Sequence, residues 1–240
     1  MLEAKEVNAG YGKLHIIFDI NFSADKRQIV AIVGPNGSGK STFLKTLIGL
    51  TNILSGKIFL MGNDITKWPP HRRSREGLAY VAQIDNVFKS LTVEENLKLA
   101  SFDLDESEFK DRLESIFSIF PQLKDIFKKR VYQLSGGQRQ MVAFSLALIR
   151  KPKFVLLDEP TAQLAPKVAS EVFKKIVEMR DSLGVGVVLV EQNARKALEI
   201  ADKAYLFVSG KVYFEGPSHT LLNHPELGKL FLGLSGGVSS

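Results

Sequence analysis

The chain is 240 residues long, with 45% hydrophobic and 24% charged residues, which is ordinary for one large domain or a domain with a small insertion. It contains no cysteine, which excludes disulfides and thiol-bound metals. Its net charge of +6 does not by itself indicate a particular binding partner. No stretch approaches the ~18–20 apolar residues of a membrane span, and the sequence after Met1 lacks an apolar signal-peptide segment. We therefore expect a cytoplasmic protein that is attached to a membrane only through partners.

The N-terminal part predicts antiparallel strands. Residues 2–7 and 16–22 are expected to form strands around a turn at Gly10, Tyr11 and Gly12. A further strand is expected at residues 57–61. These segments should stand beside a nucleotide-binding core.

A complete phosphate-binding loop comes next. The apolar run 29–33 predicts a buried strand that enters the loop, and the amphipathic run 43–48 predicts a helix that leaves it. Such a loop points backbone N–H groups at an anion, and the helix adds its positive end. Lys40 can reach the β- and γ-phosphates, and the Ser41 hydroxyl can bind Mg²⁺. A chance glycine-rich turn is the alternative, and the strand–loop–helix context disfavours it. The predicted triphosphate-binding residues here are Gly34, Pro35, Asn36, Gly37, Ser38, Gly39, Lys40, Ser41 and Thr42.

A basic cluster at residues 71–75 follows Trp68 and raises the question of nucleic acid. A tryptophan beside arginines can stack on bases. The alternative, which we favour, is a solvated turn and helix start before a strand at residues 78–81. We expect no nucleic-acid partner.

The segment from residue 86 to residue 150 has a mainly helical pattern, as in Leu113, Ile116, Phe117 and Phe120 at spacings of three and four. We expect a single domain in which this helical subdomain is inserted into a core formed by residues 1–85 and 151–234. Buried strands are expected at 154–157, 186–190 and 204–208, with a hairpin turn at 209–211. Residues 235–240 should form a flexible tail.

Two motifs that are weak alone become informative in their order after the phosphate loop. The strand at 154–157 ends in Asp158 and Glu159, at the tip where open α/β sheets hold ligands. Asp158 would hold Mg²⁺, and Glu159 would act as general base toward water. The other motif is expected at the start of a helix and consists of Leu134, Ser135, Gly136, Gly137 and Gln138. Taken alone, it could be an ordinary helix N-cap.

These motifs resemble those of the ATP-binding cassette (ABC) family, whose signature is the Leu-Ser-Gly-Gly-Gln sequence. The resemblance extends from Tyr11 to about Glu215. It implies an α/β P-loop NTPase fold with a mixed core sheet, and ATP and Mg²⁺ as cofactors. By the same resemblance, Tyr11 would stack on adenine and Gln83 would contact the metal, together with Ser41 and Asp158.

The signature also implies a second subunit. Ser135 and the N–H groups of Gly136 and Gly137 open a helix and can bind an anion. In the family, ATP lies between the phosphate loop of one subunit and the signature of another. The chain is therefore expected to supply both halves of a shared site, and the helical subdomain is expected to meet transmembrane permease subunits. Val87 and Phe88 are candidates for that contact, with core packing as the alternative for Phe88.

Closer placement rests on the segments around Ala165 and Gln192. Many cassette ATPases have aspartate at the first position and histidine at the second. The combination resembles the second ATPase subunit of branched-chain amino acid importers, which act with an external solute-binding protein; amide or urea importers and other ABC transporters are alternatives. Gln192 can donate a hydrogen bond but carries no charge. We therefore expect a heterodimer in which the partner supplies the more conventional residues and the two ATP sites are unequal. The alternatives are that Gln192 substitutes adequately and both sites work, and that the chain forms a homodimer. The predicted catalytic residues are Glu159, Gln192 and Lys40.

Two other classes are disfavoured. A DNA- or ribosome-directed cassette protein would show long heptad repeats or a second cassette, and this chain has neither. A protein that binds ATP without hydrolysing it is suggested by Gln192 and Ala165, but Glu159 argues against it.

Overall fold

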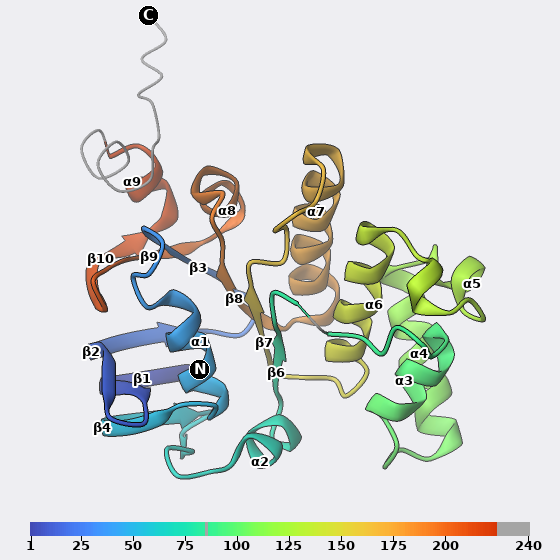
Figure 1. Cartoon of the computed structure of the whole chain (residues 1–240), viewed down its shortest axis with the longest axis horizontal. Helices are drawn as coiled ribbons and strands as arrows, with labels where there is room; N and C mark the ends of the chain where they lie inside the picture. The colour runs from blue at the N-terminus through green and yellow to red at the C-terminus, as the bar shows by residue number, and fades with distance from the viewer. Residues whose placement is uncertain (85, 225–240) are drawn as a thin grey trace, which may run out of the picture.

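A mostly parallel sheet runs through the middle of the molecule (Figure 1). The computed structural model describes residues 1–84 and 86–224. The strand order in this sheet is β10-β9-β3-β8-β7-β6, with only β10 antiparallel to its neighbour. The strands are β3 (Ile29–Val33), β6 (Leu78–Val81), β7 (Phe154–Asp158), β8 (Gly186–Val190), β9 (Lys203–Val208) and β10 (Lys211–Pro217). The expected core strands and the hairpin turn after β9 are confirmed.

A smaller antiparallel sheet covers one side of the molecule, in the order β2-β1-β4-β5. Its strands are β1 (Leu2–Tyr11), β2 (Leu14–Ala24), β4 (Asn52–Leu60) and β5 (Asn63–Asp64). The expected strands at residues 2–7 and 16–22 are confirmed. The turn between them lies at Gly12 and Lys13, later than expected, because Gly10 and Tyr11 still pair with β2. A side chain on Gly10 would lie 1.8 Å from the carbonyl oxygen of Leu14, so close strand packing explains this glycine.

Strand β4 also begins earlier than expected, at Asn52 instead of residue 57. The polar residues Asn52 and Ser55 lack the alternation of a half-buried strand. They join the sheet because β1 is long enough to pair with them, at Gly10 and Asn8. Tertiary pairing thus extends a strand that the local pattern leaves out.

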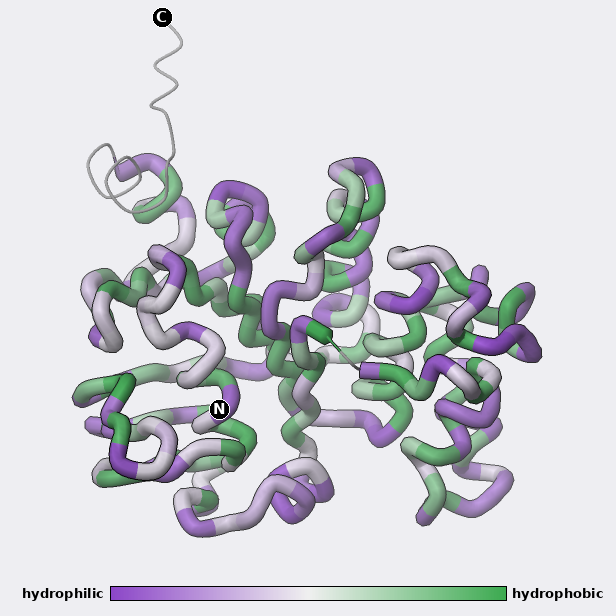
Figure 2. The backbone as a smooth tube through the Cα atoms, viewed as in Figure 1, coloured by the Kyte–Doolittle hydropathy of each residue, from purple (hydrophilic) through white to green (hydrophobic). Residues whose placement is uncertain are grey.

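The central sheet separates two hydrophobic cores. In β3, Val30 and Ile32 face α1 (Lys40–Ile48) and the small sheet, whereas Ala31 and Val33 face the helices of the other side. Figure 2 shows the central strands as nearly continuous hydrophobic tube, as expected for parallel strands covered on both faces. The helix α1 therefore lies on one face, and α6 (Gly136–Leu148) and α7 (Pro166–Leu183) lie on the other.

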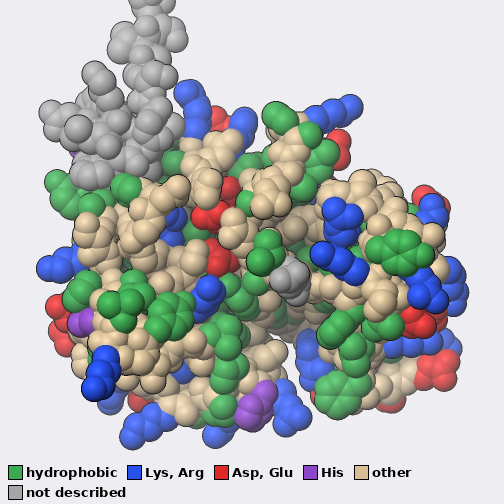
Figure 3. Space-filling view, viewed as in Figure 1, with side chains coloured by type: hydrophobic (Ala, Val, Ile, Leu, Met, Phe, Trp, Pro, Cys, Tyr) green, Lys and Arg blue, Asp and Glu red, His purple; other side chains and the backbone are tan. Residues whose placement is uncertain are grey.

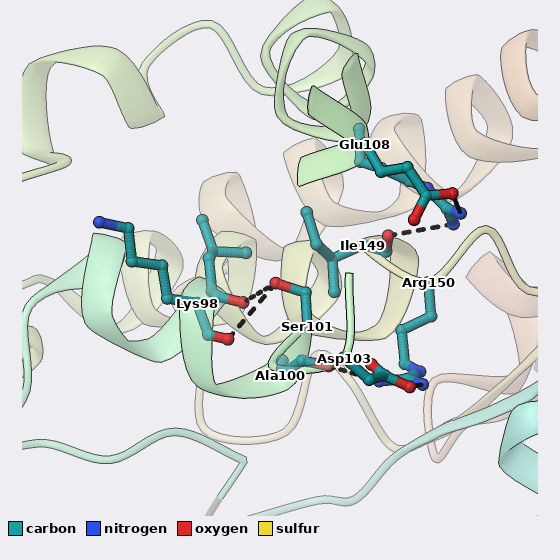
Figure 4. Close-up of polar contacts among 9 residues, drawn as sticks. Lys98, Ala100, Ser101, Asp103, Glu108, Ile149 and Arg150 are labelled. Atoms are coloured by element: carbon teal, nitrogen blue, oxygen red, sulfur yellow. Dashed lines mark hydrogen bonds and ion pairs between the residues drawn. The ribbon is translucent and has the colours of Figure 1, made fainter. Parts of the chain in front are cut away.

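Helices α3 to α6 occupy one end of the molecule (Figure 1), which confirms the helical character of this segment. They are α3 (Val93–Ala100), α4 (Glu106–Ile119), α5 (Leu123–Ile126) and α6, with a short 3₁₀ turn at Val131–Gln133. Figure 4 shows how the loop after α3 is fixed to the end of α6: Arg150 donates from Nη1 to Asp103 Oδ1 at 2.7 Å and to the Ala100 carbonyl at 3.1 Å. The division at residues 86 and 150 stays a prediction.

The remaining helices are short. They are α2 (Pro70–Arg75), α8 (Ala194–Ile200) and α9 (Ser218–Leu222). The predicted tail at 235–240 lies outside the described residues. Within residues 1–84 and 86–224, every helix falls short of the length and apolar character that crossing a bilayer requires.

The basic cluster after Trp68 contains a buried arginine, which the solvated interpretation missed. Arg73 is 1% exposed and donates to the carbonyl groups of Thr46, Leu47, Thr66 and Trp68 at 2.7–2.9 Å. Burial lowers its pKa to about 10. The carbonyls of Thr46 and Leu47 belong to the last turn of α1. The N–H of the C-cap residue Gly49 donates to the Thr46 carbonyl, and Arg73 donates to both carbonyls, so Arg73 contributes to the cap of that helix. Arg72, its neighbour, stacks on the Trp68 ring at 3.9 Å.

We expect Arg73→Met to lower the free energy of unfolding by about 3 kcal/mol, because it removes four hydrogen bonds to backbone carbonyl groups. Urea unfolding measures this. The matched control is Arg75→Met, an exposed arginine on the same helix, which should change stability by less than about 0.5 kcal/mol. Equal effects of both variants would contradict the capping role.

Candidate nucleotide site

The candidate site lies at the carboxyl ends of β3, β6, β7 and β8, where loops leave neighbouring parallel strands. In the sheet register, Ile32 and Asp158 both lie beside Val190. The phosphate loop, the acidic pair and the segment after β8 are therefore placed together by the sheet.

The phosphate loop turns sharply into α1. Gly39 is the N-cap of that helix, with φ 94°, in the left-handed region that glycine adopts without strain. The hairpin turn after β9 supports the loop, since Gly210 N–H donates to the Ser38 carbonyl at 3.1 Å. The Ser38 hydroxyl is buried, and its oxygen has no hydrogen-bond partner among the described residues. A buried polar atom without a partner in a loop of this shape fits a phosphate ligand.

Lys40 is the buried cation of the loop. It is 5% exposed, and its Nζ donates to the carbonyls of Gly34 and Pro35, both at 2.8 Å. Burial lowers its pKa, while the negative charges of Glu159 and Asp158 oppose that shift. The lysine is thus held inside the loop by neutral carbonyls that an anion could replace.

Ser41 and Asp158 form a pair of oxygen ligands. The Ser41 hydroxyl donates to Asp158 Oδ1 at 2.7 Å. Mg²⁺ prefers such hard oxygen donors and commonly completes its shell with substrate phosphates and water. No cluster of three or more His, Cys, Asp or Glu side chains among the described residues could hold a metal alone. The pair therefore fits a metal that arrives with a nucleotide.

Tyr80 orients Asp158, and the sequence analysis did not identify it. Its hydroxyl donates to Asp158 Oδ2 at 3.0 Å, so both carboxylate oxygens are occupied. Burial, and next the charge of Asp158, raise the pKa of Tyr80 above its usual range. A phenol at the end of the otherwise aliphatic strand β6 was the available signal.

Glu159 receives hydrogen bonds from both predicted glutamines. Gln192 Nε2 donates to Glu159 Oε2 at 2.9 Å, and Gln83 Nε2 donates to the same oxygen at 3.0 Å. Burial is the largest cause that raises the pKa of Glu159, and the charge of Asp158 adds to it. The Glu159 backbone has φ 49° and donates its N–H to the Val190 carbonyl. The carboxylate of Glu159 is therefore held in place from the loop after β6, through Gln83, and from the loop after β8, through Gln192.

A third buried carboxylate, Glu191, also escaped the sequence analysis. It is 2% exposed and accepts hydrogen bonds from the backbone N–H and the hydroxyl of Thr161, at 3.0 and 2.7 Å. It lines a cavity of about 360 Å³ between the loops after β7 and β8, together with Glu159 and Gln192. The glutamate directly before Gln192 was the only signal.

Tyr11 lies at the end of β1, and its side chain is 40% exposed. It is accessible for the predicted stacking on adenine, which stays a prediction.

The signature forms a capped helix start. Leu134 is buried, while the Ser135 hydroxyl accepts from Gln138 N–H at 3.2 Å and the Gln138 side chain accepts from Ser135 N–H at 2.9 Å. This reciprocal capping box leaves the hydroxyl proton of Ser135 available to an anion. A side chain on Gly137 would lie 2.6 Å from Val168 Cγ1, so α6 and α7 need glycine where they meet.

The structure does not bring the signature and the phosphate loop together. The helix α6, which the signature opens, packs on the opposite face of the central sheet from α1. Among the residues that the structure describes, the signature makes its hydrogen bonds within its own segment and none to the phosphate loop, so the two half-sites are separate in this chain.

The fold and these residues define a nucleotide-binding α/β ATPase. The model of the family of ABC transporters matches residues 17–162. The probable branched-chain amino acid transport ATP-binding protein LivF of Archaeoglobus fulgidus is 50% identical, over 98% of this chain and 99% of the relative. The high-affinity branched-chain amino acid transport ATP-binding protein BraG of Pseudomonas aeruginosa is 38% identical, over 97% of this chain and 100% of the relative.

A solved structure shows the same fold: the ADP conformation of MJ1267, an ATP-binding cassette of an ABC transporter. It has a TM-score of 0.83 and 26% identity, and the match covers 95% of this chain and 97% of that one. The chain belongs to the ABC transporter family. It is an ATP-binding cassette with ATPase activity, of the class of subunits that dimerise and work with permease subunits.

We expect Gly137→Ala to lower the free energy of unfolding by about 1–3 kcal/mol, because the added methyl group overlaps Val168. Gly136→Ala is the matched control, since its methyl group would meet only the flexible end of Leu164 at 3.2 Å. Adding Val168→Ala to Gly137→Ala should restore most of the loss. Thermal unfolding of the four proteins, wild type included, measures this, and a failed rescue would contradict the proposed overlap.

Proposed function

We propose that this chain is the ATP-hydrolysing subunit of an importer for branched-chain or other hydrophobic amino acids. The observation that carries the proposal is the 50% identity, over nearly the whole length of both chains, to a relative named for branched-chain amino acid transport. The transported substrate itself would be recognised by permease subunits and, indirectly, by an external solute-binding protein. The chain would then work at the cytoplasmic face of the membrane. Amide or urea import is the alternative that the same motifs allow.

The phosphate loop would bind ATP from one side. Its N–H groups, the Ser38 hydroxyl and the positive end of α1 favour the phosphates. Lys40 would exchange the carbonyls of Gly34 and Pro35 for phosphate oxygens. Ser41 and Asp158, with Gln83 nearby, would hold Mg²⁺, which when bound neutralises phosphate charge. Tyr11 would stack on the base.

Glu159 would accept a proton from the water that attacks the γ-phosphate. Its raised pKa makes it a better proton acceptor than an ordinary carboxylate, and hydrogen bonds from Gln83 and Gln192 keep it oriented. Gln192 can also donate toward the γ-phosphate but cannot carry charge. Lys40 stabilises the negative charge that develops.

The second subunit would supply the signature across the nucleotide. The helix after the phosphate loop and the helix that the signature opens pack on opposite faces of the central sheet, and a second cassette would provide the missing half of each site. Ala165 is exposed at the N-cap of α7 and offers no side-chain hydrogen bond to a partner. Because Ala165 and Gln192 replace residues with stronger contacts, we propose a heterodimer in which the partner carries the more effective site.

The permease would dock on the helical end of the chain. Phe88 is 60% exposed, which rules out the core-packing alternative, whereas Val87 packs partly against the core. The Phe88 backbone is held by the buried Asn96 side chain, which accepts from Phe88 N–H at 2.8 Å and donates to its carbonyl at 3.0 Å. Figure 3 shows further hydrophobic side chains exposed over this end of the molecule. A rigidly presented aromatic side chain suits a helix-in-groove contact.

The proposed catalysis is tested by Glu159→Gln. It should lower turnover by about 10²–10⁴-fold while ATP binding survives, because the general base is lost and the phosphate loop is not. Glu114→Gln, which changes an exposed residue of α4, is the matched control and should leave turnover unchanged. Near-normal hydrolysis by Glu159→Gln would overturn the assignment of the general base.

Light scattering of Glu159→Gln with ATP and Mg²⁺ tests the assembly. A dimer argues for a homodimer, and a monomer that binds ATP argues for an obligate partner subunit.

The transport proposal predicts that Glu159→Gln abolishes leucine uptake in cells that express the full importer.

The docking surface is tested by Phe88→Ala. It should retain the ATPase rate of the free chain and lose most of the stimulation by permease subunits, measured with the reconstituted complex. Leu54→Ala, an exposed apolar residue of β4 on the other sheet, should retain that stimulation. Equal stimulation of both variants would place the contact elsewhere.

A further inference from the structure

Glu191 is a buried carboxylate that the proposed mechanism does not use. It is 2% exposed, and no cation lies within ion-pair distance of it among the described residues. The nearby Lys196, which lines the same cavity, pairs with Glu199 instead. Burial raises the pKa of Glu191, and hydrogen bonds from Thr161 and from the backbone N–H groups of Asn193 and Gln192 oppose the shift. A carboxylate kept here without a cation must be held by these donors, since burying it otherwise costs several kcal/mol.

The donors come from two loops that lie beside each other at this point. Thr161 belongs to the loop after β7, and Glu191, Gln192 and Asn193 belong to the segment after β8. The same loops are joined twice more, by Glu159 N–H to the Val190 carbonyl at 2.8 Å and by Gln192 Nε2 to Glu159 Oε2 at 2.9 Å. The hydrogen bonds between Glu191 and Thr161 are thus one of three connections between the two loops, and Glu191 lies between Val190 and Gln192, which make the other two.

The loop held by Glu191 also touches the start of α6. Within it, Ala162 N–H donates to the Glu159 carbonyl at 3.1 Å and Leu164 N–H donates to the Thr161 carbonyl at 3.2 Å, which makes a compact turn. The Leu164 side chain lies 3.2 Å from where a side chain on Gly136 would be. A displacement of Thr161 would therefore move the contacts of Glu159 and of the signature together.

We propose that Glu191 is a positioning residue that acts through Thr161: it fixes the turn 159–164 against the segment that carries Gln192. This inference rests on the proposed role of Glu159. Glu191 does not contact the phosphate loop, so the placement of Glu159 and of the signature depends on it, and the initial binding of ATP does not.

The closest test uses Thr161→Val, which is nearly isosteric and removes only the hydroxyl donor. We expect it to lower turnover at saturating ATP about tenfold, as the loss of a buried hydrogen bond to a charged group predicts. The KM for ATP should change less than about twofold. Thr161→Ser keeps the hydroxyl and should retain much more turnover than Thr161→Val. Ser145→Ala, which removes another buried hydroxyl, from the middle of α6, should leave turnover unchanged.

Glu191→Gln extends the test to the acceptor. Its amide has one carbonyl oxygen in place of two carboxylate oxygens, so some of the four donors lose their partner. The double variant Glu191→Gln/Thr161→Val should be no slower than the slower single variant, because both changes disrupt the same connection, the hydrogen bonds between Glu191 and Thr161. Additive losses, equal turnover of Thr161→Val and Thr161→Ser, or a parallel rise in the KM for ATP would each overturn the proposal.

Glu159→Gln, assayed in the same series, separates this inference from the proposed function. If Glu159→Gln keeps its turnover, the assignment of the general base fails, and the positioning role fails with it. If Glu159→Gln loses turnover while Thr161→Val does not, only the positioning role fails. Should Glu191→Gln not fold, the two Thr161 variants still decide.

Discussion

The parallel pairing of β3, β8 and β7 is the constraint on which the site depends. It sets Ile32, Val190 and Asp158 side by side, so the loops that leave these strands start at one level. The phosphate loop, Glu159 and Gln192 then need only short connections to meet. The same pairing gives the sheet two buried faces, and α1 and α6 pack on different ones. A single geometric arrangement thus assembles the phosphate-loop half-site and places the helix of the signature on the other face of the sheet.

The local sequence was sufficient to predict the parts of the site that are formed by contiguous residues. The phosphate loop could be predicted because strand, glycine turn and helix are contiguous, and the tip of β7 because its acids directly follow an apolar run. Tyr80, Glu191 and Arg73 could not be predicted, since each acts through partners that the fold brings from elsewhere. Tyr80 contacts Asp158 from the neighbouring strand, and Arg73 contributes to the cap of α1 from a different helix. The full lengths of β1 and β4 escaped for the same reason, because their polar residues are ordered by pairing with each other.

Several side chains around Glu159 have hydrogen bonds that another ligand could replace. Lys40 is held by carbonyls of its own loop, and Gln83 and Gln192 share one oxygen of Glu159. In contrast, Glu191 is buried and bonded to Thr161, outside the phosphate loop, and the partly buried Tyr80 donates to Asp158 Oδ2, the oxygen that Ser41 does not contact. The site therefore combines a changeable inner set of contacts with a fixed outer set. Such an arrangement holds reacting groups in place while leaving donors free for substrate.

The charges at the carboxyl ends of the parallel strands, where the candidate site lies, explain why nucleotide and metal would have to bind together. Lys40 is the buried cation facing Asp158 and Glu159, and both carboxylates counter the effect of burial on its pKa. A triphosphate that engages Lys40 brings several negative charges toward those same carboxylates. Repulsion at such short range in a partly buried site is large. The hydroxyl–carboxylate pair of Ser41 and Asp158 offers a divalent cation a place between them, where it would offset this repulsion. Metal-free ATP should accordingly bind more weakly than its Mg²⁺ complex.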